Sequence, residues 1–386
     1  MVDTIPRLDI LLYAHDGRGL GHVSRTVAIG IALRRLFPEL RILFLSGASI
    51  SQEFIDSAPL DWIKIPSYET QIIHGRSTGL PGKSNFADKD LGLLRGEQIK
   101  QIVATYRPRI VLADHSPQGK HRELLPALKA RNPEDTRWVL GIRGVVGQVK
   151  QISSDLAATV FQEYYTSLLW YGDTTVLGKT QLRDIESQFG CKVHECGYVS
   201  ALKERIAGDS TSKKESLLGT ISIPWFGEQT ADFLHCLHAV LKEPFQEQGR
   251  WHIYLEQSHP TSAEFTSLFS QIPGCRVEPP GKRYLQSLMR SQYAVIYGGY
   301  NSLIDVLSLS LPALVILRDM QDNEQQEHLN KLIECTPDRF AIVTEACKHI
   351  ELTRALQKLI KNPEPSAFSI NLSGAEAAAK YLQALL

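Results

Sequence analysis

The chain of 386 residues lacks an excess of either charge, a long apolar segment and a regular cysteine pattern. Lys and Arg together number 42, and so do Asp and Glu, so the basic bias typical of nucleic-acid binding is missing. No apolar run approaches the roughly 18 to 20 residues that cross a bilayer, and Met1–Asp9 lacks the pattern of a signal peptide. We therefore expect a cytoplasmic protein with no transmembrane segment and no nucleic-acid partner, and leave a peripheral association with a membrane open.

The six cysteines are scattered, which is typical of reduced thiols in a cytosolic protein. Two short groups contain residue types that bind metals: Cys191-Lys-Val-His194-Glu-Cys196, and the pair His235 and His238. On a strand, Cys191 and Cys196 would face opposite sides, and a histidine pair without a third ligand is more often structural. We predict no metal at either place and no cofactor.

What the sequence does contain is an alternation of short apolar runs with helical segments. The first such series predicts a strand over Leu8–Ala14, a helix over Val23–Leu36 and a strand over Arg41–Leu45. This is a βαβ unit, which implies a parallel sheet. The alternation continues, with Ser154–Leu169 as a later helix. Residues 66–87 are rich in Ser, Gly, Pro and Asn, which predicts a long mobile loop.

A polar stretch of small residues, 203–216, separates two series of this alternation and is the predicted linker. We expect a first domain over residues 1–202 and a second over residues 217–386, ending in an alanine-rich helix from Gly374 to Leu386. Doubly wound domains place their ligand crevices at the carboxyl ends of the strands. The sequence therefore predicts an α/β protein with two Rossmann-like domains that face each other across a cleft.

A glycine turn in the second domain predicts an anion site. The apolar run Ala294–Tyr297 is followed by Gly298-Gly299, with Asn301 or Ser302 as the expected N-cap of the next helix. A strand, a glycine turn and a helix start together direct backbone N–H groups and the helix dipole toward an anion such as a phosphate. An ordinary strand-to-helix turn of an α/β protein is the alternative.

Another glycine-rich segment, Gly17-x-Gly19-x-Gly21-His22, opens the first helix. It differs from a dinucleotide-binding fingerprint, because the third glycine comes early and no acidic residue ends the next strand. His22 falls at the helix N-terminus, where the dipole lowers the pKa of a histidine and favours the neutral imidazole of a general base. A histidine that only hydrogen-bonds a loop is the alternative.

In the first domain, Gly19-Leu-Gly21-His22-Val-Ser-Arg25 resembles the N-terminal motif of MurG-like glycosyltransferases. It is closer still to the Gly-Leu-Gly-His-x-x-Arg pattern of a bacterial group known as predicted glycosyltransferases. The segments that contain Asp114 and Arg143 also resemble parts of that group's first domain. In the second domain, Gly298-Gly-Tyr-Asn-Ser302 with Asp305 resembles the group's Gly-Gly-Tyr-Asn-Thr…Glu motif, and Glu324-Gln325 resembles its Glu-Gln pair.

The resemblance implies a GT-B fold whose C-terminal helix packs back toward the first domain, a nucleotide-diphosphate sugar donor and no required metal. His22 would be the base for the acceptor hydroxyl, Asp305 would bind the ribose, and Glu324 and Gln325 would hold the donor sugar. Glycines and polar residues of the two turns would bind or shape the diphosphate site. The donor-binding residues carried over are Gly19, Gly21, Gly298, Gly299, Asn301, Ser302, Asp305, Glu324 and Gln325.

The chain departs from the group's pattern at two places. Asp305 stands where the group usually has Glu, one methylene longer, which weakens its ribose role. The first turn of the second domain carries the bulky Trp225 and Phe226 where a glycine-rich loop is usual. These rings either stack on a substrate or belong to the core. Arg25 or Arg318 could supply a cation for the leaving diphosphate, with a surface salt bridge as the alternative for each.

Three functions fit these observations. The first is metal-independent, inverting transfer of a sugar, from a UDP-sugar as the first expectation, to a hydroxyl or amine of a small-molecule or lipid acceptor. The second is hydrolysis of a nucleotide sugar, with His22 activating water. The third is a non-catalytic nucleotide-sugar-binding homologue, which the loop at Trp225 and Phe226 keeps open. No residue identifies the acceptor.

Overall fold

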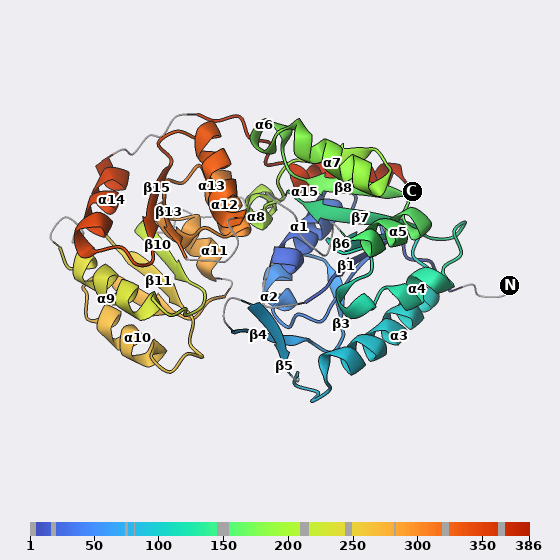
Figure 1. The fold of residues 1–386 in the computed structure, drawn as a ribbon, viewed down its shortest axis with the longest axis horizontal. Coiled ribbons are helices and arrows are strands. Elements are labelled where there is room, and N and C mark those ends of the chain that lie inside the picture. The colour runs from blue at the N-terminus through green and yellow to red at the C-terminus, as the bar shows by residue number, and fades with distance from the viewer. Residues whose placement is uncertain are drawn as a thin grey trace. The chain divides into compact units, whose positions relative to one another are not determined.

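The computed structural model describes residues 5–16, 21–73, 76–80, 82–144, 154–208, 216–243, 249–281, 283–318, 324–361 and 367–386. The chain divides into two compact units. Unit 1 comprises Met1–Gly208 and Ile370–Leu386, and unit 2 comprises Asp209–Ser369. Each unit is built on a parallel β-sheet with helices on both of its faces (Figure 1).

Unit 1 has a seven-stranded parallel sheet of order β3-β2-β1-β6-β7-β8-β9. Every residue of β1, β2 and β6 is buried, as expected of parallel strands that helices cover on both faces. The strands are β1 (Ile10–Ala14), β2 (Ile42–Ser46), β3 (Asp61–Lys64), β6 (Ile110–Asp114), β7 (Arg137–Arg143), β8 (Ser167–Tyr171) and β9 (Val193–Glu195).

Two sets of helices cover this sheet (Figure 1). One face carries α1 (Gly21–Leu36), α2 (Ser51–Ile55), α8 (Ala201–Gly208) and α15 (Gly374–Ala384). The other carries α3 (Asp88–Tyr106), α4 (Leu125–Ala130), α5 (Asp155–Tyr164) and α7 (Lys179–Phe189). The short elements η1 (Lys120–Arg122) and α6 (Thr174–Leu177) lie in connections. Most of α1 is buried, so this helix lies inside the unit.

The last helix, α15, packs on α1 within unit 1. Its buried face of Ala375, Ala378, Ala379 and Leu382 joins the same apolar core as β1 and α1. A Cβ added at Gly374 would meet backbone atoms of the segment that follows β9. The helix thus packs against the first domain, as the resemblance implies. The predicted second domain of residues 217–386 included this helix, which belongs to unit 1.

Two segments differ from their sequence-based predictions. Residues 66–87 contain an antiparallel hairpin, β4 (Glu69–Ile73) and β5 (Arg76–Leu80), instead of an uninterrupted loop. Neither strand shows the alternation of apolar and polar residues that marks a strand in sequence. The helix predicted over Ser154–Leu169 ends at Tyr164, and the residues after it form β8. The ladder with β7 decides this change, because it places Leu168 and Leu169 inside the sheet.

Unit 2 has a six-stranded parallel sheet of order β12-β11-β10-β13-β14-β15. The strands are β10 (Leu217–Ile223), β11 (Trp251–Leu255), β12 (Cys275–Glu278), β13 (Ser291–Tyr297), β14 (Ala313–Leu317) and β15 (Phe340–Thr344). One face carries α9 (Thr230–Leu241), α10 (Ser262–Ser270) and α14 (His349–Lys361), and the other carries α11 (Arg283–Leu288), α12 (Tyr300–Ser308) and α13 (Glu324–Cys335) (Figure 1).

Both sheets reverse their strand order at one place, between β1 and β6 in unit 1 and between β10 and β13 in unit 2. In open α/β sheets, the crevice outside the carboxyl ends of the strands at such a reversal is where ligands bind. Functional residues are therefore expected at these two places.

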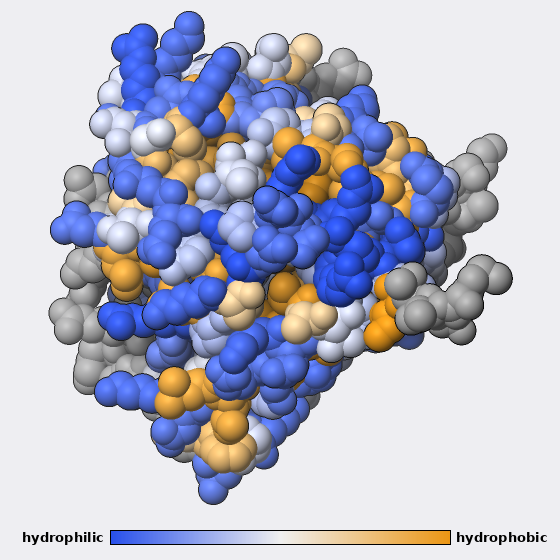
Figure 2. All heavy atoms as spheres, turned by 90° about the vertical axis from the view of Figure 1, so that its right-hand side faces the viewer, coloured by the Kyte–Doolittle hydropathy of each residue, from blue (hydrophilic) through white to orange (hydrophobic). Residues whose placement is uncertain are grey.

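The face of the molecule drawn in Figure 2 is mostly hydrophilic, with apolar residues in separate patches. Across the described ranges, no helix combines the length and the apolar character that a membrane span requires.

Candidate functional site

The reversal point of unit 1 holds a histidine–aspartate pair. His22 lies in the first turn of α1, and Asp114 is the last residue of β6. His22 Nδ1 lies 2.5 Å from Asp114 Oδ2. The Asp114 side chain is 2% exposed, whereas that of His22 is 21% exposed. A buried carboxylate thus fixes one ring nitrogen of a histidine whose side chain still reaches solvent.

Two further histidines flank His22, and the sequence analysis did not assign them to the site. His15 follows β1 directly, and its ring centroid lies 4.1 Å from that of His22. His115 follows β6, with its ring centroid 5.1 Å from that of His22. His115 has a φ of 71°, a conformation that non-glycine residues adopt rarely. The signal that could have found both is their position as the first residue after each strand at the reversal.

Burial lowers the pKa of all three imidazoles well below the usual value of a histidine. For His22, the positive charges of Arg25 and Arg143 lower the pKa further. The three rings are therefore neutral at pH 7. A neutral His22 that donates its Nδ1 hydrogen to Asp114 keeps Nε2 as a proton acceptor.

The two arginines named as candidates in this domain lie at the same place. Arg25 is buried in α1, one turn after His22, and its Nη2 lies 3.0 Å from Asp114 Oδ2. Its interaction with Asp114 is an internal ion pair, so the alternative of a surface salt bridge is wrong for Arg25. Arg143 ends β7, next to β6 in the sheet, and its charge acts on both His22 and His115.

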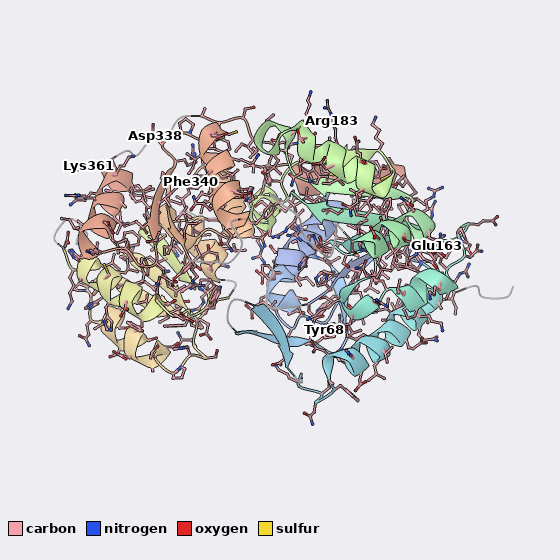
Figure 3. The ribbon with its side chains drawn as sticks, viewed as in Figure 1. Tyr68, Glu163, Arg183, Asp338, Phe340 and Lys361 are labelled. Atoms are coloured by element: carbon pink, nitrogen blue, oxygen red, sulfur yellow. The ribbon has the colours of Figure 1, made fainter. Side chains whose placement is uncertain are left out.

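A buried charge network lies beside this cluster. Arg95 of α3 is completely buried and forms ion pairs with Asp16 and with Glu123, the latter at 2.5 Å between Nε and Oε2. Tyr68, labelled in Figure 3, donates its hydroxyl to Glu123 Oε2 at 2.8 Å and its backbone N–H to Asp16 Oδ2 at 2.6 Å. The network connects the end of β1 to the residue that precedes β4. Gly21 begins α1, and Gly19 lies outside the described residues.

The glycine turn of unit 2 lies at the reversal between β10 and β13. Gly298 packs on β14, since a Cβ added there would lie 3.0 Å from Leu317 Cδ2. Gly299 is the N-cap of α12, and among the described residues no atom beyond its own local backbone and chain neighbours lies within 4 Å of the position of its missing Cβ. The helix starts at Tyr300, so the predicted N-cap at Asn301 or Ser302 is wrong, and both residues are half-buried in its first turn.

The other predicted donor residues lie on the two helices that follow. Asp305 is buried in α12 and 8% exposed. Burial raises the pKa of Tyr284 on α11, and the charge of Asp305 raises it further. Gln325, at the start of α13, approaches Gly298, with its Oε1 3.9 Å from where a Cβ of Gly298 would lie. Only the backbone of Glu324 is described. A stacked pair that the sequence analysis missed, Tyr300 and His328, joins the two helices at a centroid distance of 5.3 Å.

Arg318, which follows β14, lies in a buried polar cluster. Its guanidinium carbon lies 3.3 Å from the centroid of the Trp225 ring and 3.8 Å from that of Tyr297. Its Nε lies 3.2 Å from Glu345 Oε2. The arginine side chain is 6% exposed and that of Glu345 is 4% exposed, so a surface salt bridge is also wrong for Arg318.

The aromatic pair of the β10 turn is neither plain core nor freely exposed. Trp225 covers Arg318, and Phe226 stacks on His259 with a centroid distance of 4.4 Å and an interplanar angle of 6°. Both aromatic side chains are half-buried. Of this cluster, sequence reasoning named Trp225, Phe226 and Arg318 but missed Glu345 and Tyr297. Glu345 follows β15 and Tyr297 ends β13, so their positions at strand ends were the available signal.

Two Rossmann-like units, each with polar side chains where its strand order reverses, define an α/β protein of the GT-B fold class. No protein-family model and no curated protein matches the sequence. Among solved structures, the Neisseria meningitidis UDP-GlcNAc 2-epimerase bound to UDP-GlcNAc is similar, with a TM-score of 0.61, 11% identity and coverage of 97% of this chain and 99% of that one.

MurG from Acinetobacter baumannii is similar with a TM-score of 0.52 and 12% identity, over 97% of this chain and 95% of that one. The glycosyltransferase of kitacinnamycin gives a TM-score of 0.57 and 14% identity, over 98% and 94% of the two chains. At such identities the likeness concerns the fold, and it confirms the GT-B fold expected from the sequence motifs.

Proposed function

We propose that this protein is an enzyme acting on nucleotide sugars, and specifically a glycosyltransferase that moves a sugar from a nucleotide-diphosphate donor to a hydroxyl or amine acceptor. The observation that carries the proposal is the pair of His22 and Asp114 at the strand reversal of unit 1. The fold shared with a MurG and with an epimerase bound to UDP-GlcNAc supports a donor of the UDP-sugar class.

In the proposed reaction, His22 is the general base. The acceptor hydroxyl or amine attacks the anomeric carbon of the donor sugar, and its proton passes to Nε2 of His22. The bond between the anomeric carbon and the phosphate oxygen breaks, and the diphosphate leaves with the bonding electron pair. A single displacement inverts the configuration at that carbon. Asp114 keeps the Nδ1 hydrogen in place and stabilises the imidazolium that forms.

Unit 2 binds the donor in this proposal. The N-terminus of α12, with space over Gly299, offers N–H groups and the positive end of the helix dipole to the diphosphate. Such groups stabilise a leaving diphosphate without a metal ion. In this proposal, Asp305 binds the ribose, and Glu324 and Gln325 bind the donor sugar. Asn301 and Ser302 lie in the first turn of α12, beside the proposed diphosphate site.

Hydrolysis of the donor remains the second candidate, because a neutral His22 activates water by the same chemistry. The test incubates the protein with UDP-, GDP- and dTDP-sugars, with and without a panel of hydroxyl and amine acceptors, and separates the products by mass spectrometry. Transfer gives a glycosylated acceptor, and hydrolysis gives free sugar without any acceptor. An altered sugar still joined to the nucleotide would indicate epimerisation and would overturn both candidates.

The role of His22 has its own test. Replacing a general base lowers turnover by about 10²- to 10⁴-fold, so His22→Ala should lose that much activity while its affinity for the donor stays within about twofold. His349→Ala is the matched control, because His349 is an exposed histidine on α14. Equal turnover in the wild type and in His22→Ala would remove His22 from the mechanism.

A further inference from the structure

The cluster around Arg318 contains a buried donor group without a partner. Within the described part of the chain, the Nη1 atom of Arg318 is inaccessible to solvent and makes no hydrogen bond. Nε binds Glu345, and Nη2 donates to Trp225 O at 2.6 Å. A buried N–H group that lacks a partner is destabilising, and its retention in a folded protein calls for a ligand or water.

The surroundings of Arg318 fix its guanidinium from three sides. The rings of Trp225 and Tyr297 lie against it, and the carboxylate of Glu345 holds the Nε edge. Planar stacking with an edge-on carboxylate leaves a guanidinium little freedom to rotate. The edge that contains Nη1 is therefore held in one orientation.

Glu345 is itself fixed by other hydrogen bonds. Its Oε1 accepts from Thr230 Oγ1 at 2.5 Å and from Tyr297 OH at 2.7 Å. Thr230 is the first residue of α9, and its Oγ1 also accepts the backbone N–H of Gly227 at 2.8 Å. The carboxylate thus joins the ends of β13 and β14 to the start of α9, and Thr230 joins that helix start to the turn that follows β10. These are the elements on both sides of the strand reversal in unit 2.

The cluster adjoins the glycine turn directly. Tyr297, whose ring covers Arg318, precedes Gly298 in sequence, and Leu317 before Arg318 is the residue on which Gly298 packs. Arg318 therefore lies against Tyr297, the residue directly before the turn, and directly follows Leu317, the residue on which the turn packs. Its charge lies at the carboxyl ends of the strands beside the reversal, which is the edge of an open α/β sheet at which ligands bind.

We propose that Arg318 binds the diphosphate of the donor through its Nη1 edge and that Glu345 is a positioning residue for Arg318. The inference rests on the proposed nucleotide-sugar function. This proposal also gives Trp225 a role, because its ring packs against the guanidinium of Arg318. A glycine-rich loop has no large side chain that could hold an arginine in this way.

Binding of UDP, UMP and uridine, measured by isothermal titration calorimetry, tests the proposal. A charge-assisted hydrogen bond contributes about 1.5 to 3 kcal/mol, so Arg318→Met should weaken UDP binding about 10- to 100-fold. Uridine carries no phosphate, and its affinity should change less than twofold. Arg354→Met is the matched control, because Arg354 is an exposed arginine of the same unit, and it should leave both affinities unchanged.

Glu345→Gln tests the positioning role. The amide keeps an acceptor for Thr230 and Tyr297 but loses the charge that holds Arg318, so UDP should bind about 3- to 10-fold more weakly with uridine unaffected. Trp225→Leu should behave similarly, and Trp225→Phe should recover part of the affinity by restoring a stacking surface. Thermal unfolding of each variant identifies those that remain folded.

The outcomes separate the two proposals. A wild-type protein that binds none of the three ligands contradicts the proposed UDP-sugar donor, and the assignment of Arg318 to the diphosphate of that donor falls with it. A wild type that binds UDP more tightly than uridine, with folded Arg318→Met and Glu345→Gln variants that keep this preference, contradicts the inference alone. An equal loss of UDP and uridine binding in these variants would make the cluster structural and overturn the diphosphate role.

Discussion

Asp114 holds two side chains with one carboxylate oxygen: Oδ2 lies 2.5 Å from His22 Nδ1 and 3.0 Å from Arg25 Nη2. The arginine neutralises the buried carboxylate, and the histidine completes its hydrogen bonding. The ion pair with Arg25 compensates the burial of the carboxylate, while burial keeps the pKa of the neighbouring His22 well below its usual value. The arrangement orients His22 as a base, which makes the role of Asp114 testable.

Asp114→Asn should lower kcat by about 10²- to 10⁴-fold, because an amide can present its N–H₂ group to Nδ1 and favour the wrong tautomer of His22. The KM for the donor should change little, since Asp114 lies in unit 1, whereas Gly299, Asp305 and Gln325, which are proposed to bind the donor, lie in unit 2. Steady-state kinetics against donor concentration provide the measurement. A rise in KM with an unchanged kcat would contradict the positioning role.

The three histidines of unit 1 should make the protein sensitive to acid. Their pKa values are lowered in the folded state, whereas an unfolded chain titrates them near about 6.5. Below about pH 6.5 the unfolded state binds more protons, so the free energy of unfolding decreases as the pH falls. More than about one pH unit above that value, these groups contribute little pH dependence.

Urea unfolding between pH 8 and pH 5 measures this effect, and His115→Asn isolates one of the groups. Asn tolerates the positive φ of position 115. One buried histidine contributes up to about 1.4 kcal/mol per pH unit, so the variant should lose stability less steeply below pH 6.5 than the wild type. Identical slopes for the two proteins would show that His115 is not held neutral.

Arg95 should be essential for the stability of unit 1. Arg95→Met leaves the buried carboxylates of Asp16 and Glu123 without their positive partner, and such a loss costs about 3 to 5 kcal/mol. Urea unfolding gives the change in free energy. Lys100→Met on the same helix removes only an exposed ion pair and should change it by less than about 1 kcal/mol.

A second substitution distinguishes loss of charge from loss of packing. Adding Glu123→Gln to Arg95→Met removes one of the two unpaired charges and should recover part of the lost stability. If the double variant is no more stable than Arg95→Met, the cost comes from the cavity and not from the unpaired carboxylates.

The sequence alone determined the alternation of strands and helices, the two sheets and the glycine turns at Gly21 and Gly298. These features depend on local patterns: buried parallel strands read as apolar runs, and glycines and helix starts follow them. His22 was found for the same reason, because its place at a helix start is visible in the chain itself. The hairpin of β4 and β5 and the short strand β8 were missed, because strand pairing decides them.

Only the tertiary structure decided the partners of the site residues. Asp114 is 92 residues from His22 in sequence, and Glu345 is 27 residues from Arg318. Parallel sheets bring the carboxyl ends of distant strands together, so Asp114 meets His22 and Glu345 meets Arg318 only after the sheets form. The position of the terminal helix α15 could not be predicted from local sequence patterns either, because α15 packs on a surface of α1 that forms only when unit 1 folds.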